Sequence, residues 1–508
     1  MPDQEKEIAL TKERSKNESY EVISVGESNK VNGLNIFNKI AARVNAETKG
    51  IELVTDEEKT ETSIFNVWSM WFSANLVIAT FSLGALGITV FNLSFAQAVL
   101  VIIFFSLIGV IPVATYSVFG PKLGLRQMIL SKFLVGDYAM RIFSFINMVA
   151  GVGWGAVNIM SSAQVLSIVN NGACPPWAGC LILVLCTILV SFFGYHVIHI
   201  YENWSWVPNL GVFIAIIVRM AKSGNFTMGT MVGGATTAGH VLSFGGAVFG
   251  FATGWATFAA DYTVYQPRNV PALKIFFAVM LGLWIPLLFT LILGSACATG
   301  ITTDKRWAEL YTTNSIGGLL YAILVEDSLH GFGQFLCVLL ALSTVGNNIP
   351  NMYSMALSAQ ATWSKLSKIP RVAWTVLGNC VTLAICIPAY YHFAAVMQNF
   401  MHMIGYYLAI YEAISFSEHF IWNKGRFDVY DYEHFYDKEV YPKGYAGIFG
   451  FCCGVVGVAV GMNQVWYTSI LASKIGEYGG DIGFELAFAF AFVGFNLTRP
   501  LEKKYTGR

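Results

Sequence analysis

Residues 243–262 read SFGGAVFGFATGWATFAADY, an apolar run interrupted by four glycines: Gly245, Gly246, Gly250 and Gly254. A second apolar run, SANLVIATFSLGALG at residues 73–87, is interrupted at Gly84 and Gly87. Counted along the chain, these runs are the sixth and the first hydrophobic segments. Interrupted helices in corresponding positions of two halves are typical of inverted-repeat transporters with a binding site at the midplane. The same glycines also fit helices that pack closely through small residues, so both interpretations stay open.

The composition of the whole chain indicates a membrane protein. Of its 508 residues 12% are charged, about half the share expected of a soluble domain, and the mean hydropathy is +0.56. The 31 basic and 31 acidic residues balance, which excludes a strongly basic protein that binds nucleic acid. We expect an all-α polytopic membrane protein whose segments have at least the roughly 17–20 residues that a bilayer requires. The twelve expected spans are 64–91, 93–118, 137–168, 179–198, 204–221, 241–265, 272–298, 332–362, 372–391, 393–421, 445–466 and 481–498.

The charges between these spans predict the orientation. With the N-terminus inside, seventeen lysines and arginines outside the N-terminal tail fall on the cytoplasmic side and five on the outer side. The excess of positive charge on cytoplasmic loops therefore places both termini in the cytoplasm. We divide the chain into a disordered cytoplasmic tail (1–62), a transmembrane transporter domain (63–498) and a short cytoplasmic C-terminal tail (499–508). The N-terminus has no apolar run that would make it a signal peptide.

A small set of aromatic and carboxamide side chains lies at the predicted middle of the spans. Trp154 and Asn158 in GVGWGAVN (151–158) are four residues apart, which stacks them on one helix face. Trp255 follows Gly254 in the sixth span, and Asn347 and Asn351 are likewise four residues apart in the eighth. Two indoles and several carboxamides suit a flat, neutral, polar heterocycle, because indoles stack on its faces and carboxamides pair with its edge. Each residue alone also fits ordinary packing, and the hypothesis depends on their coincidence.

Other polar groups in the spans are candidates for ion coupling. Ser343 and Thr344 can offer hydroxyl oxygens to a small cation beside the first span, or bond their own helix. Asp261 is a candidate proton carrier or a tie at a helix end, and further carboxylates lie at Glu202, Glu412 and Glu418.

We expect no enzyme, cofactor or metal. The sequence shows no pairing of a nucleophile with a base and no nucleotide-binding loop. The nine cysteines have no zinc-site spacing with histidine and act as small apolar residues in the spans.

Four stretches resemble the nucleobase–cation symport family of the first kind, and within it the fungal purine–cytosine permease branch. They are SANLVIATFSLGALG, GVGWGAVN, GFATGWATFAADYTVYQP (250–267) and ALSTVGNNIPNMYSMALSAQA (341–361). The resemblance covers about residues 60 to 500. It implies a LeuT-like fold of five plus five inverted-repeat helices with two more, in which helices 1 and 6 are interrupted.

The resemblance also assigns roles to single residues. Trp154 and Trp255 would sandwich the base, and Asn158 would hydrogen-bond its edge. Asn351, with Asn348 nearby, would read the exocyclic groups. Thr80 falls near the polar first-span position of the family, with Ser82 as the alternative.

The resemblance implies proton-coupled import of adenine, guanine, hypoxanthine and cytosine by alternating access. Sodium-coupled relatives hold the ion near the positions of Ser343 and Thr344, whereas fungal members of this branch imply proton coupling. The alternatives are another flat heterocycle such as uracil, allantoin or thiamine, or a receptor that does not transport. We expect a plasma-membrane protein in the lipid bilayer that binds no nucleic acid, and whose tail lysines (Lys12, Lys16, Lys30) serve ubiquitin-ligase machinery.

Overall fold

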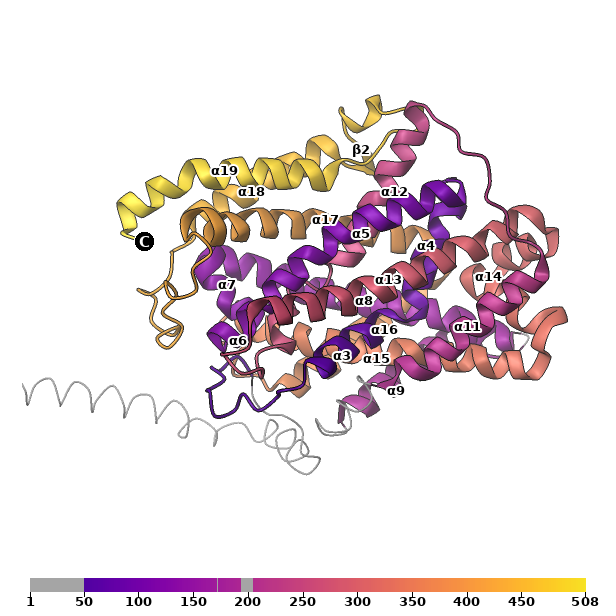
Figure 1. Ribbon diagram of the computed structural model, residues 1–508, viewed down its shortest axis with the longest axis horizontal. Coiled ribbons are helices and arrows are strands. Elements are labelled where there is room, and N and C mark those ends of the chain that lie inside the picture. The colour runs from indigo at the N-terminus through magenta and orange to yellow at the C-terminus, as the bar shows by residue number, and fades with distance from the viewer. Residues whose placement is uncertain (1–49, 171, 193–203) are drawn as a thin grey trace, which may run out of the picture.

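A computed structural model describes residues 50–170, 172–192 and 204–508, and this part of the chain is almost entirely helical (Figure 1). Its strands are β1 (Asn463–Gln464) and β2 (Tyr467–Thr468), which form a short antiparallel hairpin. The predictions for residues 1–49, including the tail lysines, and those for Glu202 and the end of the fourth span lie outside the described residues.

The helices follow the order of the predicted spans, which confirms the polytopic all-α prediction. The first span is a pair, α3 (Ile64–Asn75) and α4 (Ile78–Thr89). The others are α5 (Phe95–Ser117), α8 (Asp137–Val169), α9 (Pro176–Phe192), α11 (Trp206–Ser223), α12 (Ala235–Thr253), α13 (Ala272–Thr303), α15 (His330–Thr362), α16 (Arg371–Ala389), α17 (Phe393–Phe416), α18 (Tyr445–Gly461) and α19 (Gly483–Thr506).

By length and composition, six continuous helical stretches of the described chain can cross a membrane, and the α3–α4 pair makes a seventh. Two of these stretches, Lys305–Thr362 and Arg371–Trp422, each contain two helices joined end to end. Three predicted connections are also helical: α6 (Phe119–Leu123), α7 (Gln127–Val135) and α14 (Lys305–Leu324).

The first span is interrupted, but not at its glycines. The chain bends by 51° between Asn75 and Ile78, whereas Gly84 and Gly87 lie inside the continuous helix α4. A Cβ on Gly84 would stand 2.0 Å from the Leu291 carbonyl oxygen of α13. These glycines therefore serve close helix packing, and the prediction that they mark the interruption is wrong. Thr80 and Ser82 accordingly lie in the first turns of α4, beyond the break.

The interruption of the sixth span falls where the glycine pattern predicts it. Helix α12 ends at Thr253, a tight turn follows from Gly254, and a single helical turn, η1 (Ala259–Tyr262), continues the chain. The earlier glycines pack helices, since a Cβ on Gly250 would stand 1.9 Å from the Met401 carbonyl oxygen of α17. Helices 1 and 6 of the expected fold are thus both broken. Each break leaves backbone N–H and C=O groups without intrahelical partners inside the protein.

Helices distant in sequence are joined by buried polar contacts. Helices α8 and α15 lie against each other, and the Asn147 amide donates to the Ser358 hydroxyl at 2.8 Å. Helices α18 and α19 run side by side along one edge, next to α17 (Figure 1). In α19 the Arg499 guanidinium forms two hydrogen bonds with the Glu418 carboxylate, at 2.6 and 2.7 Å, and both side chains are buried.

Both ends of the described chain are ordered parts of the helical structure. Residues 50–62, here the docking segment, pack on the helices: the Val54 N–H donates to the Gly124 carbonyl at 2.9 Å. The Lys59 ammonium donates to Asp56 at 2.8 Å and to the Pro121 carbonyl at 3.0 Å. Buried apolar groups and paired charged groups hold this segment against the helices, although its polar, charged composition alone predicts a disordered tail. At the other end, α19 continues past residue 498 to Thr506.

Candidate substrate site

A chain of carboxamides ties the break in the first span to α8 and α15. The Asn158 amide donates to the side-chain oxygens of Asn347, at 2.7 Å, and Asn348, at 3.2 Å. The Asn347 amide in turn donates to the carbonyl of Ala74, two residues before the break. Because all three asparagines are at most 4% exposed, these bonds form away from water and stabilise the junction.

The two predicted tryptophans flank this cluster, and both are buried. The Trp154 ring meets Phe251 and Phe400 edge to face, each at a centroid distance of 5.3 Å. The Trp255 ring meets Trp71 in the same way at 5.5 Å, and its N–H donates to the Asn75 side-chain oxygen at 3.2 Å. Trp154 also rests on Gly254, where a Cβ would stand 2.3 Å from the indole. The turn in the sixth span therefore brings Trp255 and the rim of Trp154 to one place.

Several polar atoms near this junction have no hydrogen-bond partner among the described residues. Three are donors, the indole N–H groups of Trp71 and Trp154 and the amide nitrogen of Asn348, and one is an acceptor, the side-chain oxygen of Asn351. The hydroxyls of Ser73 and Thr80 are also unpaired. Buried polar groups are almost always paired, so an unpaired set at a helix break indicates a place for a polar ligand. The other half of Asn351 is held, because its amide donates to the Gly151 carbonyl at 2.8 Å.

The predicted ion-coupling residues of α15 already have protein partners. The Ser343 hydroxyl accepts from the backbone N–H of Ile78, the first residue of α4, at 3.3 Å. The Thr344 and Ser162 hydroxyls share a hydrogen bond at 2.8 Å. Ser343 therefore caps the exposed N-terminus of a half-helix, whose dipole is positive there.

Asp261 lies apart from the carboxamide cluster, in the turn η1. Its carboxylate accepts from the backbone N–H of Gln127 at 2.8 Å and from the Ser354 hydroxyl at 2.9 Å. The guanidinium of Arg126 donates to its backbone carbonyl at 2.8 Å. These contacts tie the end of the sixth span to α7 and α15, which favours the helix-end interpretation of this residue.

Three residues of the junction were not singled out from the sequence: Trp71, Asn75 and Tyr262. The Trp71 ring packs edge to face on both Trp255 and Tyr262, and the Tyr262 hydroxyl donates to the Pro350 carbonyl at 2.6 Å. Asn75 carried a usable signal, since an asparagine inside an apolar span is costly unless it has a function or a partner.

The space beside Trp255 is small in this conformation. A cavity of about 10 Å³, lined by Trp71, Ser73, Tyr262 and Pro350 among others, has room for roughly one water molecule. The glycines beside Trp154 do not leave open room either, because a Cβ on Gly153 would stand 2.2 Å from the Phe400 ring. The structure is therefore closed around the junction, and a base would enter only after the helices separate.

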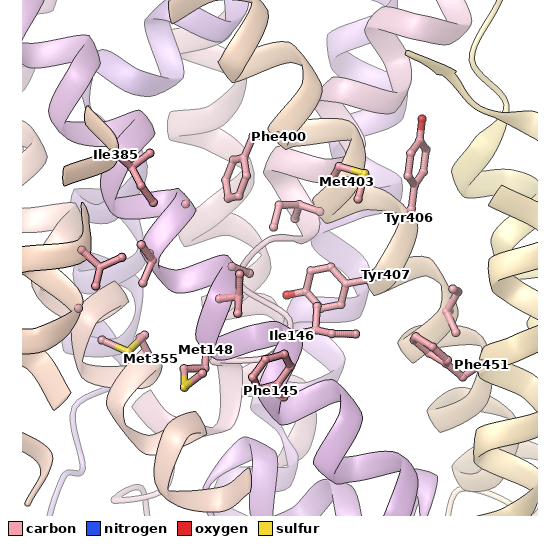
Figure 2. Close-up of a pocket in the computed structure, with 18 of the residues that line it drawn as sticks. Phe145, Ile146, Met148, Met355, Ile385, Phe400, Met403, Tyr406, Tyr407 and Phe451 are labelled. Carbon is pink, nitrogen blue, oxygen red and sulfur yellow. The ribbon is translucent and has the colours of Figure 1, made fainter. Parts of the chain in front are cut away.

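A much larger cavity is an apolar groove of about 800 Å³ between α8, α16, α17 and α18 (Figure 2). Figure 2 shows Phe400 among the groove residues, and the same ring packs against Trp154. Its lining includes Phe145, Ile385 and Met403 and is almost entirely hydrocarbon, with exposed side chains along its mouth. A polar heterocycle would leave its hydrogen-bonding groups unpaired there, so the groove does not suit such a ligand.

A helical membrane fold in which two broken helices meet at a buried polar cluster is that of a secondary transporter. A comparison of folds finds a solved structure with the same helical arrangement. The closed, bromovinylhydantoin-bound structure of Mhp1, a nucleobase-cation-symport-1 family transporter, superposes with a TM-score of 0.65 at 13% identity. The match covers 91% of this chain and 95% of Mhp1, and it shows the fold.

The chain belongs to the family of permeases for cytosine/purines, uracil, thiamine and allantoin, whose profile matches residues 53–483. The purine-cytosine permease FCY2 of Saccharomyces cerevisiae is 55% identical, over 99% of this chain and 95% of its own length. The purine-cytosine permease fcyB of Emericella nidulans is 46% identical, over 92% of this chain and 91% of its own length. The resemblance seen in the sequence is thereby confirmed.

Proposed function

We propose that the protein imports purine bases and cytosine across the plasma membrane together with protons, by alternating access. The observation that carries the proposal is the set of unpaired donors and acceptors of Trp154, Asn348 and Asn351 beside two broken helices. The similarity to purine-cytosine permeases over nearly the whole chain supports this choice of substrate.

The proposed binding mode uses the geometry of the junction. As the helices separate, the base enters between Trp154 and Trp255, and its ring replaces the edge-on contacts of both indoles. Stacking on an aromatic ring is worth about 1–3 kcal/mol per base. The free amide nitrogen of Asn348 then donates to an acceptor on the base edge, and the free oxygen of Asn351 accepts from a donor there. Asn158 holds Asn348 in position. The Thr80 hydroxyl offers a further contact.

Two features support coupling to protons rather than sodium. The Ser343 oxygen, a candidate ligand for a cation between the first and eighth spans, accepts the N–H of Ile78 and so has one lone pair fewer to offer. The positive end of the α4 dipole also lies there and disfavours a bound cation. We assign no cofactor, and the driving force is the proton gradient.

The remaining assignments concern orientation and turnover. The seventeen cytoplasmic and five outer positive charges support cytoplasmic termini. In this orientation the N-terminal tail is on the cytoplasmic side, where its lysines would serve ubiquitin-ligase machinery.

The test is uptake of radiolabelled cytosine in cells that lack their own permease, with and without a protonophore. We expect saturable uptake that adenine competes and that the protonophore abolishes. Uptake that resists the protonophore but requires sodium would return the coupling to Ser343 and Thr344. Competition by uracil, allantoin or thiamine instead of adenine would change the substrate, and surface protein without uptake would favour a receptor.

A further inference from the structure

We propose that Glu412 is the residue that carries the coupled proton, through its contact with Thr253 at the break of the sixth span. The inference rests on the proposed proton-coupled transport and adds the group that binds the proton. Glu412 lies on α17, is 2% exposed, and accepts a hydrogen bond from the Thr253 hydroxyl. Thr253 is the last residue of α12, and Gly254 and Trp255 follow it directly.

The surroundings of Glu412 distinguish it from other buried carboxylates. No described lysine, arginine or histidine forms an ion pair with it, and its described side-chain bond comes from a neutral hydroxyl. Glu418, by contrast, pairs with Arg499, and Asp261 has two hydrogen-bond donors with Arg126 beside it. A buried carboxylate with so little compensation is unfavourable, so we take Glu412 as the neutral acid in the closed protein.

Among the described residues, the titratable groups that face Glu412 do not supply a positive charge. They are tyrosines: Tyr116 from α5, and Tyr407 and Tyr411 from α17 itself. The Tyr411 hydroxyl accepts from the Gln127 side chain at 2.9 Å, and the Gln127 backbone N–H donates to Asp261. The neutral side chains of Tyr411 and Gln127 thus connect the Glu412 region to Asp261, at the end of the sixth span.

Proton binding at Glu412 is linked to substrate binding because both act on the same seam. The seam joins α12 and α17 at three points: His402 bonds the Ser243 carbonyl at 2.8 Å, Gly250 touches Met401, and Thr253 bonds Glu412. With this seam formed, Gly254 lies against Trp154 and Glu412 is buried. A closed, loaded transporter therefore requires the proton on the Glu412 carboxyl. Opening toward the cytoplasm admits water, which stabilises the carboxylate, and the proton leaves.

The test uses the purified full-length protein in liposomes, with wild type, Glu412→Gln, Glu412→Asp and a matched control, Glu485→Gln. Glu485 is another carboxylate inside a span, on α19, with one side-chain oxygen unpaired among described residues. We expect wild type and Glu485→Gln to accumulate cytosine when an inward proton gradient is imposed, and to take up a proton on binding cytosine. Glu412→Gln should lose both, while cytosine counterflow at equal pH stays within about tenfold of wild type. Glu412→Asp should restore proton uptake.

The outcomes separate this inference from the proposed function. Wild-type protein that fails to accumulate cytosine refutes the proton-coupled function itself. Wild-type accumulation that survives in Glu412→Gln, or is lost in Glu485→Gln instead, refutes the role of Glu412. If Glu412→Gln does not fold, Thr253→Val decides, because it removes one hydroxyl that stabilises the carboxylate. Its pH of half-maximal uptake should rise by roughly 0.4–1 unit, and an unchanged value overturns the inference.

Discussion

The contact between Gly254 and Trp154 gives the most direct test of the substrate site. In Gly254→Ala the new Cβ would stand 2.3 Å from the Trp154 ring, whereas carbon atoms in contact are about 3.5–4.0 Å apart. The indole, or the turn that carries Trp255, must therefore move by more than about 1 Å. Forcing a methyl into a packed interior costs about 1–3 kcal/mol. If the strain falls on the closed, loaded state, the KM for cytosine rises roughly 5- to 150-fold.

Uptake of labelled cytosine, normalised to protein at the cell surface, measures this effect. The matched control is Gly211→Ala in α11, where a Cβ would meet nothing within 4 Å. Alanine stabilises an exposed helix position relative to glycine, so the control should transport normally. A Gly254→Ala protein with wild-type KM and maximal rate would show that Trp154 is not held against the turn during transport, and would remove the basis for the proposed binding mode.

Three further predictions concern single contacts. Asn351→Ala removes an unpaired acceptor at the junction and should reduce cytosine uptake by about tenfold or more at normal surface expression, and normal affinity would contradict its role. Trp255→Phe keeps an aromatic ring, although a smaller one, and loses the N–H bond to Asn75, so the KM should rise about 2- to 10-fold, and an unaltered KM would mean that this bond does not position the side chain. Lys59→Ala should release the docking segment and speed its cleavage by protease; cleavage at the wild-type rate would argue against the contacts described. The Lys59 hydrogen bond holds the pKa of the Asp56 carboxyl below its usual 3.8. The stabilisation of the docking segment by this pair is therefore present at neutral pH and is lost as the pH falls through the lowered pKa of Asp56.

The sequence predicts the order of the apolar helices because hydropathy reports what a bilayer requires of each segment. It also locates the break in the sixth span, because the chain turns at Gly254 against the Trp154 ring, where a larger residue would not fit. It misplaces the break in the first span because glycine has two uses in membrane helices. Gly84 lets α4 approach Leu291 of α13, a partner about two hundred residues away that no local pattern reveals.

The sequence predicts which residues form the junction more readily than it predicts the contacts between them. Polar and aromatic residues at mid-span pick out Trp154, Asn158 and Trp255, which the structure brings around one junction. The sequence does not show that Asn75 binds Trp255, or that Ser343 caps the half-helix beginning at Ile78. Both contacts depend on how the helices cross, and crossing is set by side chains from several elements at once.

The glycine contacts between helices have a consequence for genetics. Alanine, the smallest replacement, already places a carbon 2.0 Å from backbone at Gly84 and Gly294 and 1.9 Å at Gly250, and every glycine codon reaches larger residues by one nucleotide change. Selection for resistance to a toxic substrate analogue should therefore recover alleles along these helix contacts, at residues that do not themselves contact the substrate. Such alleles would fail by lost assembly or surface abundance, with recognition of the analogue intact. Their map would trace the helix contacts before it traced the binding site.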